Sequence, residues 1–140
     1  MILYKKSIEN DKLSAYILYD NWKNPDHVKN EIKKLYNLKP QLEGVILIGD
    51  IPIPMIRGAQ HLTSAFKLDE HNYPWYKSSV PSDRFYEDFD LNFEYLGQDS
   101  VYFLYHYYQL TGYSPQKIQK EIYSARIKST PDDSLKYERL

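Results

Sequence analysis

Short blocks of hydrophobic residues, separated by polar stretches, divide the chain into successive elements. Residues 12–20 (KLSAYILYD) form one block, which is rich in β-branched and aromatic side chains and is bounded by Asp and Asn. This composition predicts a buried strand. The run at residues 45–48 (VILI) is continuous rather than alternating, which is typical of a strand covered on both faces by helices. Residues 120–128 (KEIYSARIK) are expected to form a further inner strand.

A helix is expected between the first two strands. Asn24 is a preferred N-cap residue, Pro25 fits the first helical position, and Asp26 favours the positive end of the helix dipole. The apolar positions that follow fall on one helical face, and they are Val28, Ile32, Leu35 and Tyr36. The solvent-facing side is expected to carry Lys29, Lys33 and Lys34. Pro40 is expected to end the helix.

The chain is expected to leave the sheet directly after the run at residues 45–48. Gly49 and Asp50 follow this run, and Pro52 and Pro54 lack the amide hydrogen that an inner ladder needs. In open α/β sheets the ligand crevice lies beyond the carboxyl ends of the parallel strands, so Asp50 is expected at its rim. Residues 55–82 show no sustained period and are expected to form a long excursion, a kind of loop that is usually functional.

The pattern changes to a period of two after residue 83. Phe89, Leu91, Phe93 and Tyr95 alternate with polar residues, which predicts a half-exposed strand or ribbon. Residues 100–110 are strongly aromatic and fit either a strand or a helix. Thr130, Pro131 and two aspartates favour a helix start, so we expect the polypeptide to continue in its natural context. Residues 1–140 are therefore interpreted as one domain or as the amino-terminal segment of a longer one.

Composition excludes several classes of function. Lys and Arg total 18 against 19 for Asp and Glu, and the net charge of -1 gives no broad attraction to phosphate backbones. Nucleic acid is therefore not an expected partner. No window approaches the run of about 20 apolar residues that a membrane span needs, so no membrane insertion is expected. The chain has 15 tyrosines, whose ring and hydroxyl suit the half-buried rims of cores and binding surfaces.

The residues available for chemistry are limited. Cysteine is absent, which excludes thiolate zinc sites and thiol nucleophiles. The serines lack a nucleophile-elbow pattern, and a single glycine at position 49 is not a dinucleotide fingerprint. The histidines are His27, His61, His71 and His106, and no two of them have the spacing of metal ligands on a helix. No cofactor is expected, although a metal or acid–base role for His61 and His71, beside Asp69 and Glu70, stays open.

The acidic segment at residues 87–99 imitates a calcium loop. Asp88, Asp90, Asn92 and Asp99 have the ligand spacing, but Phe93 occupies the place where the sharp turn requires glycine. The alternation described above explains the same acids as the solvated face of a strand. No metal site is predicted, and calcium binding by this segment stays an open alternative.

Three short motifs, in their order along the chain, resemble the front half of the gingipain-like cysteine peptidases and their relatives on the caspase-like fold. They are Gly49-Asp50 after a buried strand, Pro81-Ser82-Asp83 before an aromatic, acid-rich segment, and Ala125-Arg126-Ile127 at the end of a strand. The resemblance spans residues 13–140. It implies an extracytoplasmic or secreted location.

The catalytic residues of that family are missing. Its catalysis uses a His followed by Gly and, further on, a Cys that attacks the peptide carbonyl, and this chain has neither. The chain by itself is therefore expected to be inactive. Either it is the amino-terminal portion of a longer peptidase-like domain, or it is a relative that has lost the reaction. We prefer the first account, because it also explains the unfinished helix.

The resemblance implies that Asp50 and Asp83 are substrate-binding residues. Both would sit near strand ends on the substrate side, where a carboxylate can hold a basic side chain. The alternative is structural: Asp50 caps backbone amides in the turn before Pro52, and Asp83 pairs with Arg84, Arg126 or a lysine.

The expected fold is α/β, a three-layer sandwich with a mainly parallel sheet that is caspase-like and incomplete. The expected function is a non-catalytic scaffold and substrate-side wall, whose partners are the remainder of the parent polypeptide and a peptide substrate. The alternative, from another class, is a non-enzymatic surface or interaction domain that binds peptide or glycan through the Tyr-rich segments.

Overall fold

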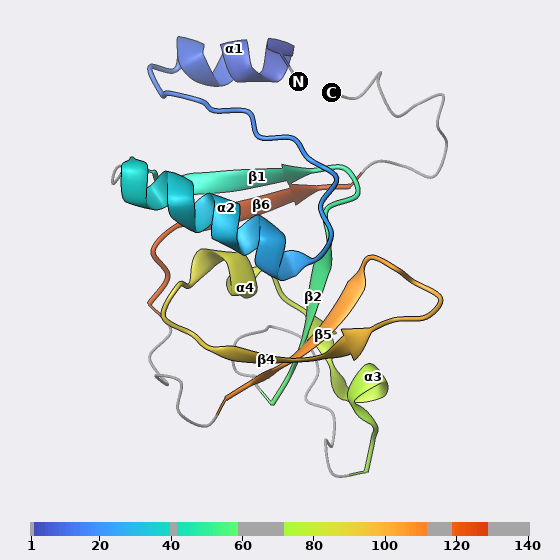
Figure 1. The fold of residues 1–140 in the computed structure, drawn as a ribbon. Coiled ribbons are helices and arrows are strands. Elements are labelled where there is room, and N and C mark those ends of the chain that lie inside the picture. Colours follow the sequence, from blue (N-terminus) through green and yellow to red (C-terminus); the bar gives the residue numbers. More distant parts are fainter. Residues whose placement is uncertain (1, 40–41, 59–71, 112–118, 129–140) are drawn as a thin grey trace.

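The computed structural model describes residues 2–39, 42–58, 72–111 and 119–128. These residues form a mixed α/β fold with two small sheets and helices beside them (Figure 1). The helix expected from Thr130, together with His61 and His71, lies outside the described residues.

The first sheet consists of β1 (Gly44–Ile48) and β6 (Tyr123–Ile127), which pair in parallel. Gly44 lies opposite Tyr123 and Ile48 lies opposite Ile127, so both strands end at the same edge. The amide of Gly49 donates to the carbonyl oxygen of Ile127 at 2.9 Å and extends the ladder by one bond. The sequence predicts that both segments are strands of a mainly parallel sheet, and their pairing is parallel.

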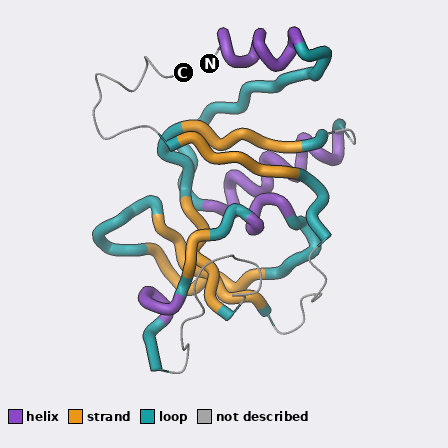
Figure 2. Tube along the Cα trace, turned by 180° about the vertical axis from the view of Figure 1, so that it is seen from behind, coloured by secondary structure: helices purple, strands orange, loops and turns teal. Residues whose placement is uncertain are grey.

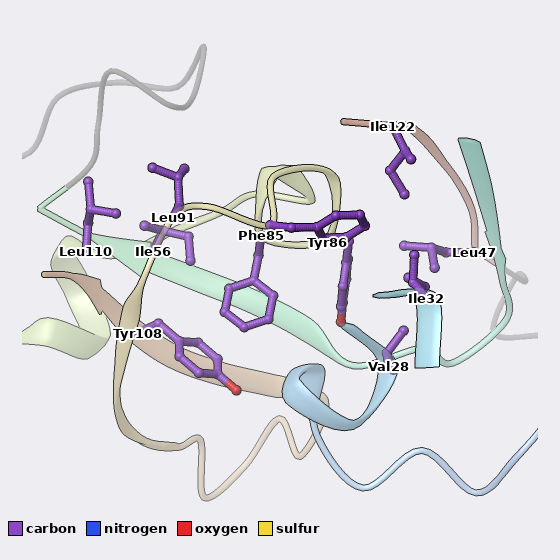
Figure 3. Packing of buried hydrophobic residues seen from close by; sticks show 11 residues of the cluster. Val28, Ile32, Leu47, Ile56, Phe85, Tyr86, Leu91, Tyr108, Leu110 and Ile122 are labelled. Atoms are coloured by element: carbon purple, nitrogen blue, oxygen red, sulfur yellow. The ribbon is translucent and has the colours of Figure 1, made fainter. Parts of the chain in front are cut away.

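Helix α2 (Pro25–Leu38) covers one face of this sheet. The side chain of Asn24 accepts a hydrogen bond from the amide of His27 at 2.8 Å, which caps the helix as predicted. Val28 and Ile32 lie one turn apart and join Leu47 of β1 in the buried core (Figure 3). On the opposite face Ile46 is exposed. Helices therefore do not cover both faces of β1 in the described part of the chain, contrary to the sequence expectation.

Lys29 departs from the expected solvent-facing side of α2. Its Nζ lies over the rings of Phe85 and Phe93, at 4.8 and 5.3 Å from their centroids, and 3.5 Å from the carbonyl oxygen of Leu91. Burial lowers the pKa of Lys29 from 10.5 to about 8, although the charge of Asp88 opposes the shift. The apolar stem and the rings thus draw this lysine towards the core.

The second sheet has four strands in the order β3 (Val80–Pro81), β2 (Ile53–Arg57), β5 (Tyr105–Leu110) and β4 (Phe93–Gln98). The central pair, β2 and β5, is parallel, and the two outer pairs are antiparallel. The aromatic segment at residues 100–110, for which strand and helix were both open, therefore contains a strand.

Pro54 lies inside β2, so it does not keep the chain out of a sheet. The amide of Ile53 donates to Leu104, just before β5, at 2.7 Å, and Pro54 therefore faces β3. Its carbonyl oxygen accepts a bond from the Ser82 amide at 3.0 Å. Proline is tolerated here because the two-residue strand β3 does not need the missing amide. The expected departure from the first sheet does occur after Gly49.

One buried cluster joins both sheets to α4 (Arg84–Glu87) (Figure 3). Phe85 of α4 packs on Tyr108 of β5 with ring centroids 4.6 Å apart. The cluster consists of Val28, Ile32, Leu47, Ile56, Phe85, Tyr86, Phe89, Leu91, Tyr108, Leu110 and Ile122. A single turn of helix is marginal on its own, so packing of Phe85 and Tyr86 holds α4 in place.

The prediction of a buried strand at residues 12–20 is wrong. This segment is extended, and no backbone hydrogen bond joins residues 13–20 to other described residues. A strand needs a ladder partner, and among the described residues β1 pairs only with β6. The preceding helix α1 (Ile2–Asn10) buries no residue and stands away from both sheets (Figure 2).

The half-exposed ribbon predicted after residue 83 is only partly correct. Strand β4 begins at Phe93, and α4 and a turn precede it. Asp88 is 1% exposed, and its Oδ1 accepts the amides of Asp90 and Leu91, each at 3.1 Å. Glu87 is also buried. These two acids therefore do not belong to a solvated strand face, because local backbone and side-chain donors turn them inward.

Candidate functional site

β1 and β6 end side by side, and the residues that follow β1 form the candidate site. Gly49 has a φ of +90°, a left-handed conformation in which a side chain would be strained. No atom would touch an added Cβ, so the backbone conformation, rather than space, requires glycine. This turn places Asp50 at the edge of the sheet with an exposed side chain.

Arg126 of β6 fixes the backbone that connects the two sheets. Its Nε and Nη2 donate to Oδ2 and Oδ1 of Asp83 at 2.9 and 2.7 Å. Its Nη1 and Nη2 also donate to the carbonyl oxygens of Ile51 and Pro52, at 2.8 and 3.2 Å. The planar guanidinium thus holds a carboxylate and two successive carbonyls at once, which a lysine could not do.

Tyr86 binds the same connection. Its hydroxyl donates to the carbonyl oxygen of Pro52 at 2.8 Å. Burial raises the pKa of Tyr86, and the charge of Arg126 opposes this only in part. Burial alone would lower the pKa of Arg126, but its hydrogen bonds with Asp83 and the charge of that carboxylate outweigh burial and raise it. At neutral pH the connection is therefore held by a neutral phenol and a charged guanidinium.

A cavity of roughly 330 Å³ opens beside this edge, between the extended segment, α2 and β1. Its walls are mainly apolar, and the carboxylates among its lining residues are Asp20, Glu31 and Asp50. No Lys, Arg or His is among the described residues that line it. Its volume falls at the lower end of small-ligand pockets, which span about 300–1,000 Å³. This lining favours an apolar ligand or one with a positively charged group.

Two of the cavity's carboxylates have basic neighbours. Oε1 of Glu31 lies 2.5 Å from Nζ of Lys34, and Oδ2 of Asp20 lies 3.6 Å from Nε2 of His27. Both pairs are partly exposed to solvent, so each contributes little and can open when a ligand approaches.

The two residues predicted to bind substrate lie in different settings. Both oxygens of Asp83 accept hydrogen bonds from Arg126, which is one of the structural pairings considered from the sequence. Asp50 is exposed and borders the cavity. The structure brings the two positions together through Arg126, which binds Asp83 and the carbonyl of Ile51, next to Asp50. Their role in substrate binding stays a prediction.

The histidines and the acidic segment form no metal centre in the described part of the chain. No group of three or more His, Asp or Glu side chains is arranged there to hold a metal ion. His106 lies buried in β5, and burial lowers its pKa. Oδ1 of Asp99 accepts the amides of Val101 and Tyr102, both at 2.8 Å, so this carboxylate shapes its own loop.

Sequence reasoning missed the buried acid Glu87, which joins α4 to β6. Its Oε1 accepts bonds from the amide and hydroxyl of Ser124, at 3.0 and 2.7 Å, and its Oε2 lies 3.0 Å from Nη1 of Arg84. The spacing of Arg84 and Glu87, three residues apart, was the available signal, because such residues face each other on a helix. The period-two pattern concealed it.

Comparison of the chain with family models, with curated proteins and with solved structures found no match. Within the described ranges, no helix is both long enough and apolar enough to cross a membrane. The class defined by the structure is therefore a mixed α/β protein with parallel and mixed strand pairing, in which two parallel strands end beside an acidic-rimmed apolar cavity.

Proposed function

We propose that this chain forms the scaffold and substrate-side wall of a caspase-like, gingipain-related peptidase domain with a three-layer α/β architecture. The observation that carries the proposal is the meeting of three distant motifs at one edge. The amide of Gly49 binds the carbonyl of Ile127, and the side chain of Arg126 binds Asp83. Motifs that meet in this way support a common role for the segments that contain them.

The part of this chain in the reaction would be to bind the substrate. The chain has no Cys and no His-Gly pair, so the nucleophile and its base would come from another segment of the parent polypeptide. Asp50, exposed at the cavity rim, would hold a basic side chain of a peptide. Arg126 and Tyr86 would keep the connecting backbone, and with it Asp50, in position.

The test uses the full product of the parent reading frame with short fluorogenic peptides that carry Arg, Lys or Leu before the scissile bond. Asp50→Asn should raise KM for the Arg and Lys peptides by about tenfold or more, because a charged hydrogen bond is lost, and should leave the Leu peptide unchanged. Asp90→Asn, an exposed acid in the turn before β4, is the matched control. Absence of cleavage, or an equal effect on all three peptides, contradicts the proposal.

A second candidate function is a non-enzymatic domain that binds peptide or glycan through the Tyr-rich segments. The loop between β4 and β5 favours it, because Val101, Tyr102 and Phe103 are 70%, 63% and 70% exposed. The loop is nevertheless held internally: Gln98 Nε2 donates to the carbonyl of Phe103 at 2.6 Å, and the Tyr107 hydroxyl donates to Asp99 at 2.7 Å. A preordered aromatic surface loses little entropy on binding.

Arrays of peptides and glycans would test this second function. The double variant Tyr102→Ser, Phe103→Ser should weaken any specific binding by tenfold or more, because exposed aromatic side chains commonly dominate binding energy. Tyr19→Ser removes a still more exposed ring, at 86%, from the segment before α2 and should have no effect. Binding that is unchanged in the double variant contradicts this function.

A further inference from the structure

The segment at residues 13–20 has the side chains of a buried strand but the position of an exposed strap. Leu13, Tyr16 and Leu18 are 52%, 51% and 49% exposed, and no backbone hydrogen bond joins the segment to the other described residues. Contiguous apolar side chains that stay exposed are costly in water, and an extended backbone without a ladder partner can pair with another strand. Pairing with another strand would therefore lower the free energy of this segment.

The open edge of β1 can serve as this partner. The bonds from the Gly49 amide and to the Glu43 carbonyl both run to the β6 segment, so the odd-numbered backbone groups of β1 face β6. The backbone groups of Ile46 and Ile48 then face the opposite edge, which has no partner strand among the described residues. An unpaired strand edge is a ready template for another strand.

The strap lies across one cavity from that edge. Ile17 and Leu18 line the cavity on one side, and residues 45–48 line it on the other. In Figure 1 the strap passes above β1 and runs in the direction in which β1 points. Helix α2 follows the strap and precedes β1, so the three segments have the order of a strand–helix–strand unit, whose strands pair in parallel.

We propose that residues 13–20 close onto β1 as a third, parallel strand, and that the structure holds this strap in its open position. Closure pairs the free groups of Ile46 and Ile48, covers the apolar side chains and fills the cavity. It also brings Asp20 beside Asp50 at the carboxyl edge of the sheet. The strap thus determines whether the cavity is accessible to a ligand, and this inference does not depend on the proposed peptidase role.

Amide hydrogen exchange followed by NMR on the intact chain tests the closure. The amides of Ile46 and Ile48 should exchange at least about a hundredfold more slowly than unstructured reference rates. Leu47 is the internal control, because its amide faces β6 and is protected in both positions of the strap. Protection of Leu47 with free exchange of Ile46 and Ile48 would overturn the inference.

Engineered disulfides give a second measurement, since the chain has no cysteine of its own. Ile46→Cys is combined in turn with Tyr16→Cys, Leu18→Cys or Asp20→Cys, three positions on one face that sample the register. A disulfide needs Cα atoms about 4.4–6.8 Å apart, so one pair should oxidise at least tenfold faster than the control pair Ile46→Cys, Leu3→Cys. Circular dichroism of the reduced variants checks the fold. Equal oxidation rates for all four pairs would overturn the inference.

Discussion

Arg126 and Asp83 form a two-point ion pair between residues that lie 43 positions apart in the sequence. Their side chains are 17% and 24% exposed, so solvent screens the pair only in part. The same guanidinium binds the carbonyl oxygens of Ile51 and Pro52. One side chain therefore ties together β6, the start of α4 and the connection between the sheets.

Removal of this guanidinium should destabilise the fold. We expect Arg126→Met to lower the free energy of unfolding by about 3 kcal/mol, because Asp83 is left without its partner and two carbonyls lose their donor. Arg126→Lys should cost about half as much, since it restores the charge but not the two-point geometry. Urea unfolding at pH 7 measures both values.

The control for this variant is Lys34→Met, which removes an exposed cation of α2 and should change stability by less than about 0.5 kcal/mol. A double-mutant cycle with Asp83→Asn should give a coupling energy of at least about 1 kcal/mol. A coupling energy near zero would show that the pair contributes nothing to stability.

Lys29 should make stability rise with pH in mildly alkaline solution. Burial lowers its pKa to about 8 in the folded chain, so between pH 8 and 10.5 the unfolded chain binds more protons than the folded one. The free energy of unfolding should therefore increase by about 1–2 kcal/mol from pH 8 to about 9.5, before unfolded tyrosines ionise. Lys29→Met should abolish this increase, whereas Lys34→Met should retain it. Equal pH profiles for the two variants would refute the assignment.

Tyr108 should have the opposite effect at higher pH. Burial raises its pKa, and the hydrogen bond of its hydroxyl to Oδ2 of Asp26, at 2.7 Å, raises it further. Its contribution to stability is present below the unfolded pKa of about 10 and is lost as the pH rises beyond it. Tyr108→Phe should cost about 1 kcal/mol at pH 9 and less at pH 11. Tyr19→Phe, at an exposed position, should cost nothing at either pH.

Asp88 should stabilise the fold through its side-chain carboxylate, which accepts two backbone amides, and not through a metal ion. Asp88→Ala should cost about 1–2 kcal/mol, since the amides of Asp90 and Leu91 lose their acceptor, while Asp88→Asn keeps that oxygen and should cost less. Thermal melts with and without a calcium chelator complete the experiment. We expect the same midpoint in both, and a lower midpoint with chelator would revive the calcium interpretation of residues 87–99.

Local signals in the sequence predicted the elements whose stability is decided locally. Asn24 and Pro25 correctly predicted the start of α2, and the continuous run at residues 45–48 correctly predicted β1. The position of Asp50 at an edge of the sheet was predicted from the rule that ligand crevices lie beyond the carboxyl ends of parallel strands. The pairing of Asp83 with Arg126 was one of several alternatives, and only the fold selects among them.

The incorrect sequence predictions have causes that lie far away along the chain. Residues 12–20 have strand composition, but a strand exists only where a neighbouring edge pairs with it. Lys29 lies on the polar side of the helical pattern, yet the rings of Phe85 and Phe93, about 60 positions away, draw it inward. Asp88 fits an alternating pattern that a helical turn followed by a capped loop produces equally well. The cavity could not be predicted, since its walls come from three separate segments.

The hydrogen bonds from Arg126 to the carbonyl oxygens of Ile51 and Pro52 also have a mechanical consequence. A force applied along β6 is transmitted through the guanidinium to the residues just before β2, in addition to the covalent connection. The second sheet therefore bears part of a load applied to the first. The two sheets therefore resist shear as a single body, and Arg126→Met should lower the force needed to slide them apart.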